Sequence, residues 1–93
     1  MLLADPSWIA TNSDAATFLT AAGVPVRRML SPRVHAKTIV ADGAQAYLGS
    51  ENLSATSLDK NREVGLILTW TEADAVQLVA DTFEADWLAA TAF

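Results

Sequence analysis

The sequence has 93 residues, a net charge of −5 and an apolar fraction of 52%, and it contains no cysteine. This length is at the small end of the domain range and predicts one compact unit with a marginal core. The lack of cysteine excludes disulfides, thiolate nucleophiles and sulfur-rich zinc sites. The acidic charge disfavours a broad surface that follows nucleic-acid phosphates, because such surfaces need clustered Lys and Arg.

The apolar content of so short a chain has two readings. It either reflects the many alanines or indicates apolar surface that a partner or neighbouring structure covers. The longest apolar stretch, residues 64–70, is far short of the roughly 20 residues that cross a bilayer. Met1 is followed closely by Asp5 and Pro6, which is not the pattern of a signal peptide. We therefore expect neither a leader nor a membrane span, and a place in the cytoplasm or at a membrane surface.

The first half of the chain is expected to hold one helix and three strands. A helix is predicted over residues 13–22, because a capping run precedes an apolar pattern and Gly23 follows it. The apolar positions of that pattern are Ala15, Phe18, Leu19 and Ala22. Strands are predicted over residues 24–30, 34–41 and 45–49, and the Asp42-Gly43 pair joins the last two by a tight turn.

The second half is expected to hold a loop, a strand and a long helix. Residues 50–61 are polar and predict a loop with one helical turn, and residues 62–70 predict a strand. Thr71 is the expected cap of the final helix, whose apolar residues recur at helical spacing as Val76, Leu78, Val79, Phe83, Trp87 and Leu88. The whole pattern predicts a mixed α/β fold in which helices cover a mixed β-sheet.

The hairpin at Gly43 is expected to gather polar side chains. Alternate residues of a strand share a face, so His35 and Lys37 should point the same way. A reversal at Gly43 pairs residues whose numbers sum to about 86 or 87. This register sets Lys37 beside Gly49 or Ser50.

The same register sets His35 beside Glu51 or Asn52. A histidine, a lysine, a hydroxyl and a carboxamide would then meet at one end of the hairpin. Imidazole can attack phosphorus or protonate a leaving oxygen near neutral pH. Lys37 would stabilise developing negative charge, and Ser50 and Asn52 would add directional donors. Each residue also has a structural reading, such as a solvated strand lysine or a helix cap at Asn52.

The run from His35 to Asn52 reads His-x-Lys, four residues, Asp, six residues, Gly-Ser-x-Asn. It resembles the signature of the phospholipase D superfamily, and six fixed positions recur by chance roughly once in 10⁸ starting points. The resemblance continues through residues 57–59, 61–63, 83 and 86–87, and covers about residues 24–90. It implies a partial phospholipase D-like layered sandwich. Residues 1–93 would be a single domain, the C-terminal lobe of a cardiolipin synthase-like or bacterial phospholipase D-like protein, with one HKD motif.

In that family two motifs meet face to face, and no metal or cofactor is needed. One histidine attacks phosphorus to form a phosphohistidine and the other acts as general acid, the role that the resemblance favours for His35. It implies His35, Lys37, Asn52 and Glu63 as catalytic residues, with Lys37, Ser50 and Asn52 binding the phosphate. Asp42 and Gly49 belong to the structural part of the motif, because Asp42 lies at the turn, far from His35.

Glu63 is expected to accept a hydrogen bond from His35 and to orient its ring. The alternative is a surface carboxylate that pairs with Arg62 or Lys60. The remaining carboxylates are scattered and the chain has one histidine, so a metal site is not expected.

The expected function is phosphodiester hydrolysis or phosphatidyl transfer by half of a two-motif active site. The partner would be a second HKD lobe, either upstream in a longer chain or in a homodimer. Phospholipid is favoured as the substrate, with contact to a membrane surface. A nuclease acting on nucleic-acid phosphodiesters and a non-catalytic truncated lobe remain as alternatives.

Overall fold

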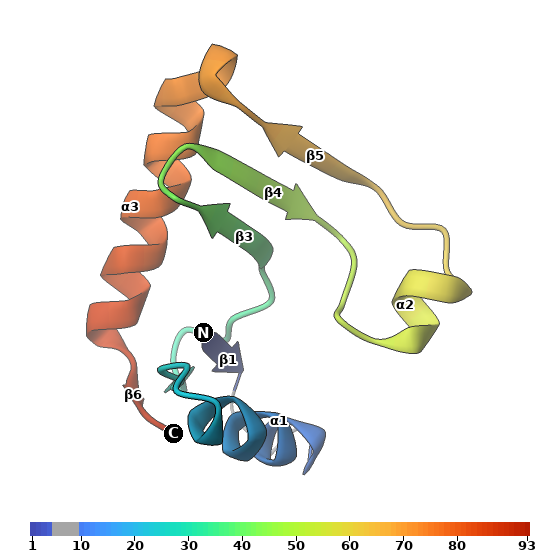
Figure 1. Ribbon diagram of the computed structural model, residues 1–93, viewed down its shortest axis with the longest axis vertical. Coiled ribbons are helices and arrows are strands. Elements are labelled where there is room, and N and C mark those ends of the chain that lie inside the picture. Colours follow the sequence, from blue (N-terminus) through green and yellow to red (C-terminus); the bar gives the residue numbers. More distant parts are fainter. Residues whose placement is uncertain (5–9) are drawn as a thin grey trace. The chain divides into compact units, whose positions relative to one another are not determined.

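The computed structural model describes residues 1–4 and 10–93, which form two compact units. The first unit contains residues 1–35 and 84–93, and the second contains residues 36–83. Asp5 and Pro6, on which the expectation about a leader depends, lie outside the described residues. The elements in chain order, most of which Figure 1 labels, are β1 (Leu2–Ala4), α1 (Ala10–Ala21), β2 (Arg27–Met29), β3 (Lys37–Ala41), β4 (Gln45–Gly49), α2 (Ala55–Asp59), β5 (Gly65–Leu68), the 3₁₀ turn η1 (Trp70–Glu72), α3 (Ala73–Ala89) and β6 (Thr91–Ala92).

The first unit contains a three-stranded sheet with β2 in the middle. β1 runs parallel to β2, and β6 runs antiparallel to it. α1 ends as predicted next to Gly23, whose φ of 80° lies in the left-handed region that favours glycine. Ala16 of α1 and Met29 of β2 are buried. The short strands β1 and β6 were not predicted from the sequence.

Arg27 joins β2 to the end of α3 within the same unit. Its Nη1 atom donates to the backbone oxygens of Trp87 at 2.8 Å and Ala90 at 3.4 Å, and its guanidinium lies 4.9 Å from the centre of the Trp87 ring. The last carbonyls of a helix lack partners within the helix and carry partial negative charge. Arg27 therefore caps the C-terminal end of α3.

The second unit contains the antiparallel sheet β3-β4-β5. Lys37 pairs with Gly49 and Ala41 with Gln45, so paired residue numbers sum to 86 throughout and the predicted register is confirmed. The turn between these strands holds Asp42 and Gly43 at φ values of 56° and 64°, the backbone that tight hairpin turns need. In Figure 1, α2 lies near the ends of β4 and β5 that are farthest from this turn.

The start of β3 differs from the expectation. The strand predicted over residues 34–41 begins at Lys37, and His35 precedes it in irregular, exposed backbone. β4 ends at Gly49, so the β3–β4 ladder begins at the pair Lys37–Gly49 and does not include His35. The placement of His35 beside Glu51 or Asn52 stays a prediction, and His35 and Lys37 are not alternate residues of one strand.

The start of the last helix also differs. Thr69, and not Thr71, is the N-cap residue of the 3₁₀ turn η1, which leads directly into α3. The Thr69 N–H donates to Glu72 Oε2 at 2.9 Å, as in a capping box. The carboxylate of Glu72 reaches back three residues, which sets the cap two residues earlier than predicted. The strands predicted over residues 24–30 and 62–70 are shorter in the structure, as β2 and β5.

The core of the described residues is small. Its buried apolar side chains are Ala16, Met29, Ala46 and Val76. Several large apolar side chains of the β3-β4-β5 sheet are exposed instead, with 63% of Leu66 and 73% of Ile67 accessible. The apolar content noted in the sequence thus lies largely at the surface. Among the helices of the described residues, none has the length and apolarity needed to cross a bilayer.

Candidate functional site

Lys37 shares one face of its sheet with two glycines. Residues paired across antiparallel strands point to the same side, so Lys37, Gly49 and Gly65 form one row on this face. Tyr47 lies on the same face and its ring extends over both glycines. A Cβ atom on Gly49 would come within 1.9 Å of Tyr47 Oη, and one on Gly65 within 2.4 Å of Tyr47 Cε2. The glycine of the Gly-Ser pair is therefore required by the neighbouring ring.

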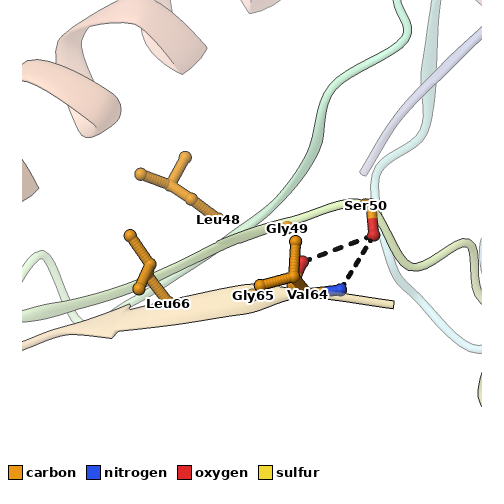
Figure 2. Close-up of a pocket in the computed structure, with 6 residues that line it drawn as sticks. All are labelled: Leu48, Gly49, Ser50, Val64, Gly65 and Leu66. Carbon is orange, nitrogen blue, oxygen red and sulfur yellow. Dashed lines mark hydrogen bonds between the residues drawn. The ribbon is translucent and has the colours of Figure 1, made fainter. Parts of the chain in front are cut away.

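Ser50 follows β4 directly and extends its pairing with the segment before β5. Its N–H donates to the Val64 carbonyl at 3.0 Å, and its Oγ accepts from the Val64 N–H at 3.1 Å. Figure 2 shows Ser50 Oγ turned toward these backbone atoms. The Ser50 hydroxyl also donates to Glu63 Oε2. A hydroxyl has one hydrogen to donate, and of its two acceptors Glu63 is nearer than the Val64 carbonyl oxygen at 3.4 Å.

Glu63 accepts hydrogen bonds on both carboxylate oxygens. Oε1 receives Ser57 Oγ at 2.7 Å and Asn61 Nδ2 at 3.2 Å, while Oε2 receives Ser50. The hydrogen bond from Ser50 and then that from Ser57 lower the pKa of Glu63, with smaller contributions from Asn61 and the charge of Lys37. We call Ser50, Ser57, Asn61 and Glu63 the serine–carboxylate cluster.

The cluster changes the expected surroundings of Glu63. Sequence reasoning considered His35, Arg62 and Lys60 as partners, and those contacts stay predictions. The uncharged donors Ser57 and Asn61 were missed. Both residues lie in the stretches 57–59 and 61–63, which resemble the family. That resemblance does not indicate which groups their side chains contact.

Asn52 is held through its backbone. Its N–H donates to Ser57 Oγ at 3.1 Å, and its carbonyl accepts from the Ser54 N–H at 2.8 Å. The Asn52 side chain is exposed. Ser54 is the N-cap residue of α2, and its Oγ accepts from the Ser57 N–H at 3.3 Å. The reading of Asn52 as the helix cap was therefore wrong, and its carboxamide is not used for that purpose.

An open apolar depression of about 450 Å³ lies on the other side of the β4–β5 pair. Leu48, Ser50, Val64 and Leu66 line it around the two glycines, and Figure 2 shows both leucines projecting to the same side. These residues alternate with the row that contains Lys37, so the depression lies on the opposite face. Its lining is almost wholly apolar.

The structure thus brings together Ser50, Glu63 and the backbone of Asn52, with the charge of Lys37 acting on Glu63. His35 is exposed and precedes Lys37 by two residues. Asp42 lies in the turn at the far end of the hairpin, as expected. In the described part of the chain, no three His, Asp or Glu side chains are grouped so that they could hold a metal ion.

Comparison with known proteins gives two findings. The family model described as cardiolipin synthase, phospholipase D-like domain, matches residues 4–87. The structure of Nuc, a phospholipase D family member from Salmonella typhimurium, is similar with a TM-score of 0.76 and 21% sequence identity, over 87% of this chain and 53% of that one. This chain therefore spans about half the length of Nuc, and at this identity the likeness shows the fold. No curated protein matches the chain. Because the family model covers most of the sequence, the chain belongs to the family of cardiolipin synthase, phospholipase D-like domains.

Proposed function

We propose that this chain is one lobe of a two-motif enzyme and supplies half of an active site for phosphodiester hydrolysis or phosphatidyl transfer. The family is of the phosphodiesterase type. The observation that carries the proposal is the position of Lys37. It pairs with Gly49 at the end of the hairpin, and its charge contributes to the lowered pKa of Glu63.

The proposed reaction has two steps. A histidine of the second lobe attacks phosphorus, forming a P–N bond as the bond to the leaving oxygen breaks, and His35 gives its proton to that oxygen. In the second step water or an alcohol attacks the phosphohistidine. His35 takes the proton of this nucleophile, the P–N bond breaks, and both histidines return to their starting state.

The other residues bind and orient. Lys37 and the exposed carboxamide of Asn52 stabilise the phosphoryl oxygens as their negative charge rises. Glu63 favours the charged form of the His35 ring. Ser50 contributes to phosphate binding when its hydroxyl hydrogen leaves Glu63, and otherwise holds the carboxylate in place.

Phospholipid is the proposed substrate class. The net charge of −5 works against a surface that follows a polyanion, whereas a lipid headgroup presents a single phosphodiester. Binding to vesicles of anionic phospholipid is the supporting result. A salt-dependent DNA affinity in a gel-shift experiment would instead favour a nuclease.

The second lobe is required because the chain has one histidine and the proposed mechanism uses two. It would come from an upstream segment of a longer protein or from a second copy about a two-fold axis. If neither completes the site, the chain is a non-catalytic lobe that keeps the fold.

Hydrolysis of bis(p-nitrophenyl) phosphate tests the proposal. As a dimer, in which the second copy supplies the other histidine, the intact chain should show turnover that disappears in His35→Ala and Lys37→Ala and persists when a chelator is added. Lys60→Ala is the matched control, because it removes an exposed lysine of the same unit to which the proposed mechanism gives no role. A folded dimer without turnover would favour the non-catalytic lobe.

A further inference from the structure

Ser57 is the one polar side chain that is buried among the described residues, with 3% of its surface accessible. It lies on α2, between the Gly-Ser-x-Asn segment and Glu63. The signature from His35 to Asn52 does not include it, and the proposed mechanism gives it no role. A buried hydroxyl in a chain with so small a core needs a physical reason.

The hydrogen bonds of Ser57 connect two residues of the proposed site. Its Oγ donates to Glu63 Oε1 at 2.7 Å and accepts from the Asn52 N–H at 3.1 Å. A serine hydroxyl has one donor and two acceptor positions. One oxygen atom therefore joins the backbone of Asn52 to the carboxylate of Glu63, which an apolar side chain of similar size cannot do.

The local backbone holds Ser57 in place for these contacts. Ser54 caps α2 and accepts from the Ser57 N–H, and the Ser54 N–H donates to the Asn52 carbonyl. Asn52, Ser54 and Ser57 thus form a closed chain of hydrogen bonds at the start of α2. This short helix fixes the direction in which the Ser57 hydroxyl points.

We propose that Ser57 is a positioning residue of the phosphodiester site. It holds the carboxylate of Glu63 and the backbone at Asn52 in a fixed position relative to each other. The inference rests on the proposed function for its catalytic consequence. Ser57 does not touch the substrate. It acts through Glu63, which orients the acid, and through Asn52, which binds the phosphate.

Three variants separate this role from a merely structural one. Ser57→Ala removes both hydrogen bonds. Asn61→Ala removes a donor to the same Glu63 oxygen without touching Asn52, and Ser54→Ala weakens the α2 cap while keeping the Ser57 hydroxyl. Thermal unfolding of each variant first checks that it folds.

The first measurement follows the ¹³Cδ resonance of Glu63 through an acid titration of the intact chain. Because Ser57 stabilises the ionised carboxylate, Ser57→Ala should raise the pKa of Glu63. Asn61→Ala should raise it less, as the weaker contributor, and Ser54→Ala should leave the Glu63 titration close to that of the original chain. An unchanged Glu63 titration in folded Ser57→Ala would overturn the inference.

The second measurement is the hydrolysis of bis(p-nitrophenyl) phosphate. Ser57→Ala should lose about tenfold in kcat/KM, the size expected for one hydrogen bond to a charged group, and more than Asn61→Ala or Ser54→Ala. If Ser57→Ala and Ser54→Ala lower kcat/KM equally, the loss reflects the stability of α2, and the positioning role of Ser57 is overturned. If the original chain forms a folded dimer and shows no turnover, the proposed function fails, and the Glu63 titration still decides whether Ser57 orients the carboxylate.

Discussion

Glu63 is oriented mainly by uncharged donors, with the charge of Lys37 contributing less to its lowered pKa than the hydrogen bonds from Ser50 and Ser57. Hydrogen bonds from hydroxyl and amide groups fix the direction of a carboxylate without neutralising its charge. A residue held in this way can still favour a positive charge nearby, which is the role proposed for it toward His35.

The two perturbed carboxylates predict how stability depends on pH. The pKa of Glu63 and that of Glu72 lie below their ordinary value of 4.5 in the folded chain, in Glu72 mainly because of the Thr69 backbone N–H. The unfolded chain therefore binds more protons as pH falls below 4.5, and stability is lost as pH falls through the folded pKa values. Urea unfolding between pH 7 and pH 3 should show this loss, and the double variant Glu63→Gln, Glu72→Gln should show a smaller one.

Gly49 offers a test of close packing. Gly49→Ala places a Cβ where the Tyr47 hydroxyl lies, and overpacking of this kind costs about 1–3 kcal/mol. The cost should fall below about 0.5 kcal/mol when Gly49→Ala is introduced into Tyr47→Ala, because the ring is then absent. Urea unfolding of the four chains measures this coupling, and additive effects would show that the ring is not the cause.

At the scale of elements, α1 and α3 are stabilised by contacts that cannot be read from the sequences of these helices alone. α1 buries Ala16, whereas Phe18, which belongs to its predicted apolar pattern, is 75% exposed. α3 receives Arg27 at its C-terminal end from a strand 60 residues away in sequence. The spacing of apolar residues predicted where these helices lie, but tertiary packing determines which face of each helix is buried.

Arg27→Ala should destabilise the end of α3. It removes two hydrogen bonds to backbone oxygens and the stacking on Trp87, together worth about 1–3 kcal/mol. Amide hydrogen exchange should become faster in the last turn of α3, near residues 87–90. Arg62→Ala, which removes an exposed arginine, is the control, and equal exchange in both variants would contradict the capping role.

For the whole molecule, the small core and the exposed sheet residues predict that association increases stability. If a second copy completes the lobe, the unfolding temperature should rise with protein concentration. A hundredfold excess over the dissociation constant stabilises a bound state by about 2.7 kcal/mol. Scanning calorimetry over about a hundredfold range of concentration measures this effect. An unfolding temperature independent of concentration would leave an upstream lobe as the partner.

The sequence by itself determined the hairpin and the family. The Asp42-Gly43 turn and the extended segments on each side of it fix the register, because a tight turn leaves few ways to pair the strands. The signature from His35 to Asn52 depends on spacing along the chain, and the family model matches residues 4–87. Strand β4 has the bounds predicted for it, and α1 and the final helix followed from periodicity, with boundaries that shifted by a few residues.

Only the tertiary structure decided what surrounds Glu63. Ser50, Ser57 and Asn61 reach it because β4 and the segment before β5 lie side by side and α2 turns one hydroxyl inward. Hydrogen-bond partners depend on direction and distance across segments, which spacing along the chain does not specify. For the same reason the sequence did not reveal that β3 begins at Lys37, that Arg27 caps α3, or that Tyr47 requires glycine at position 49.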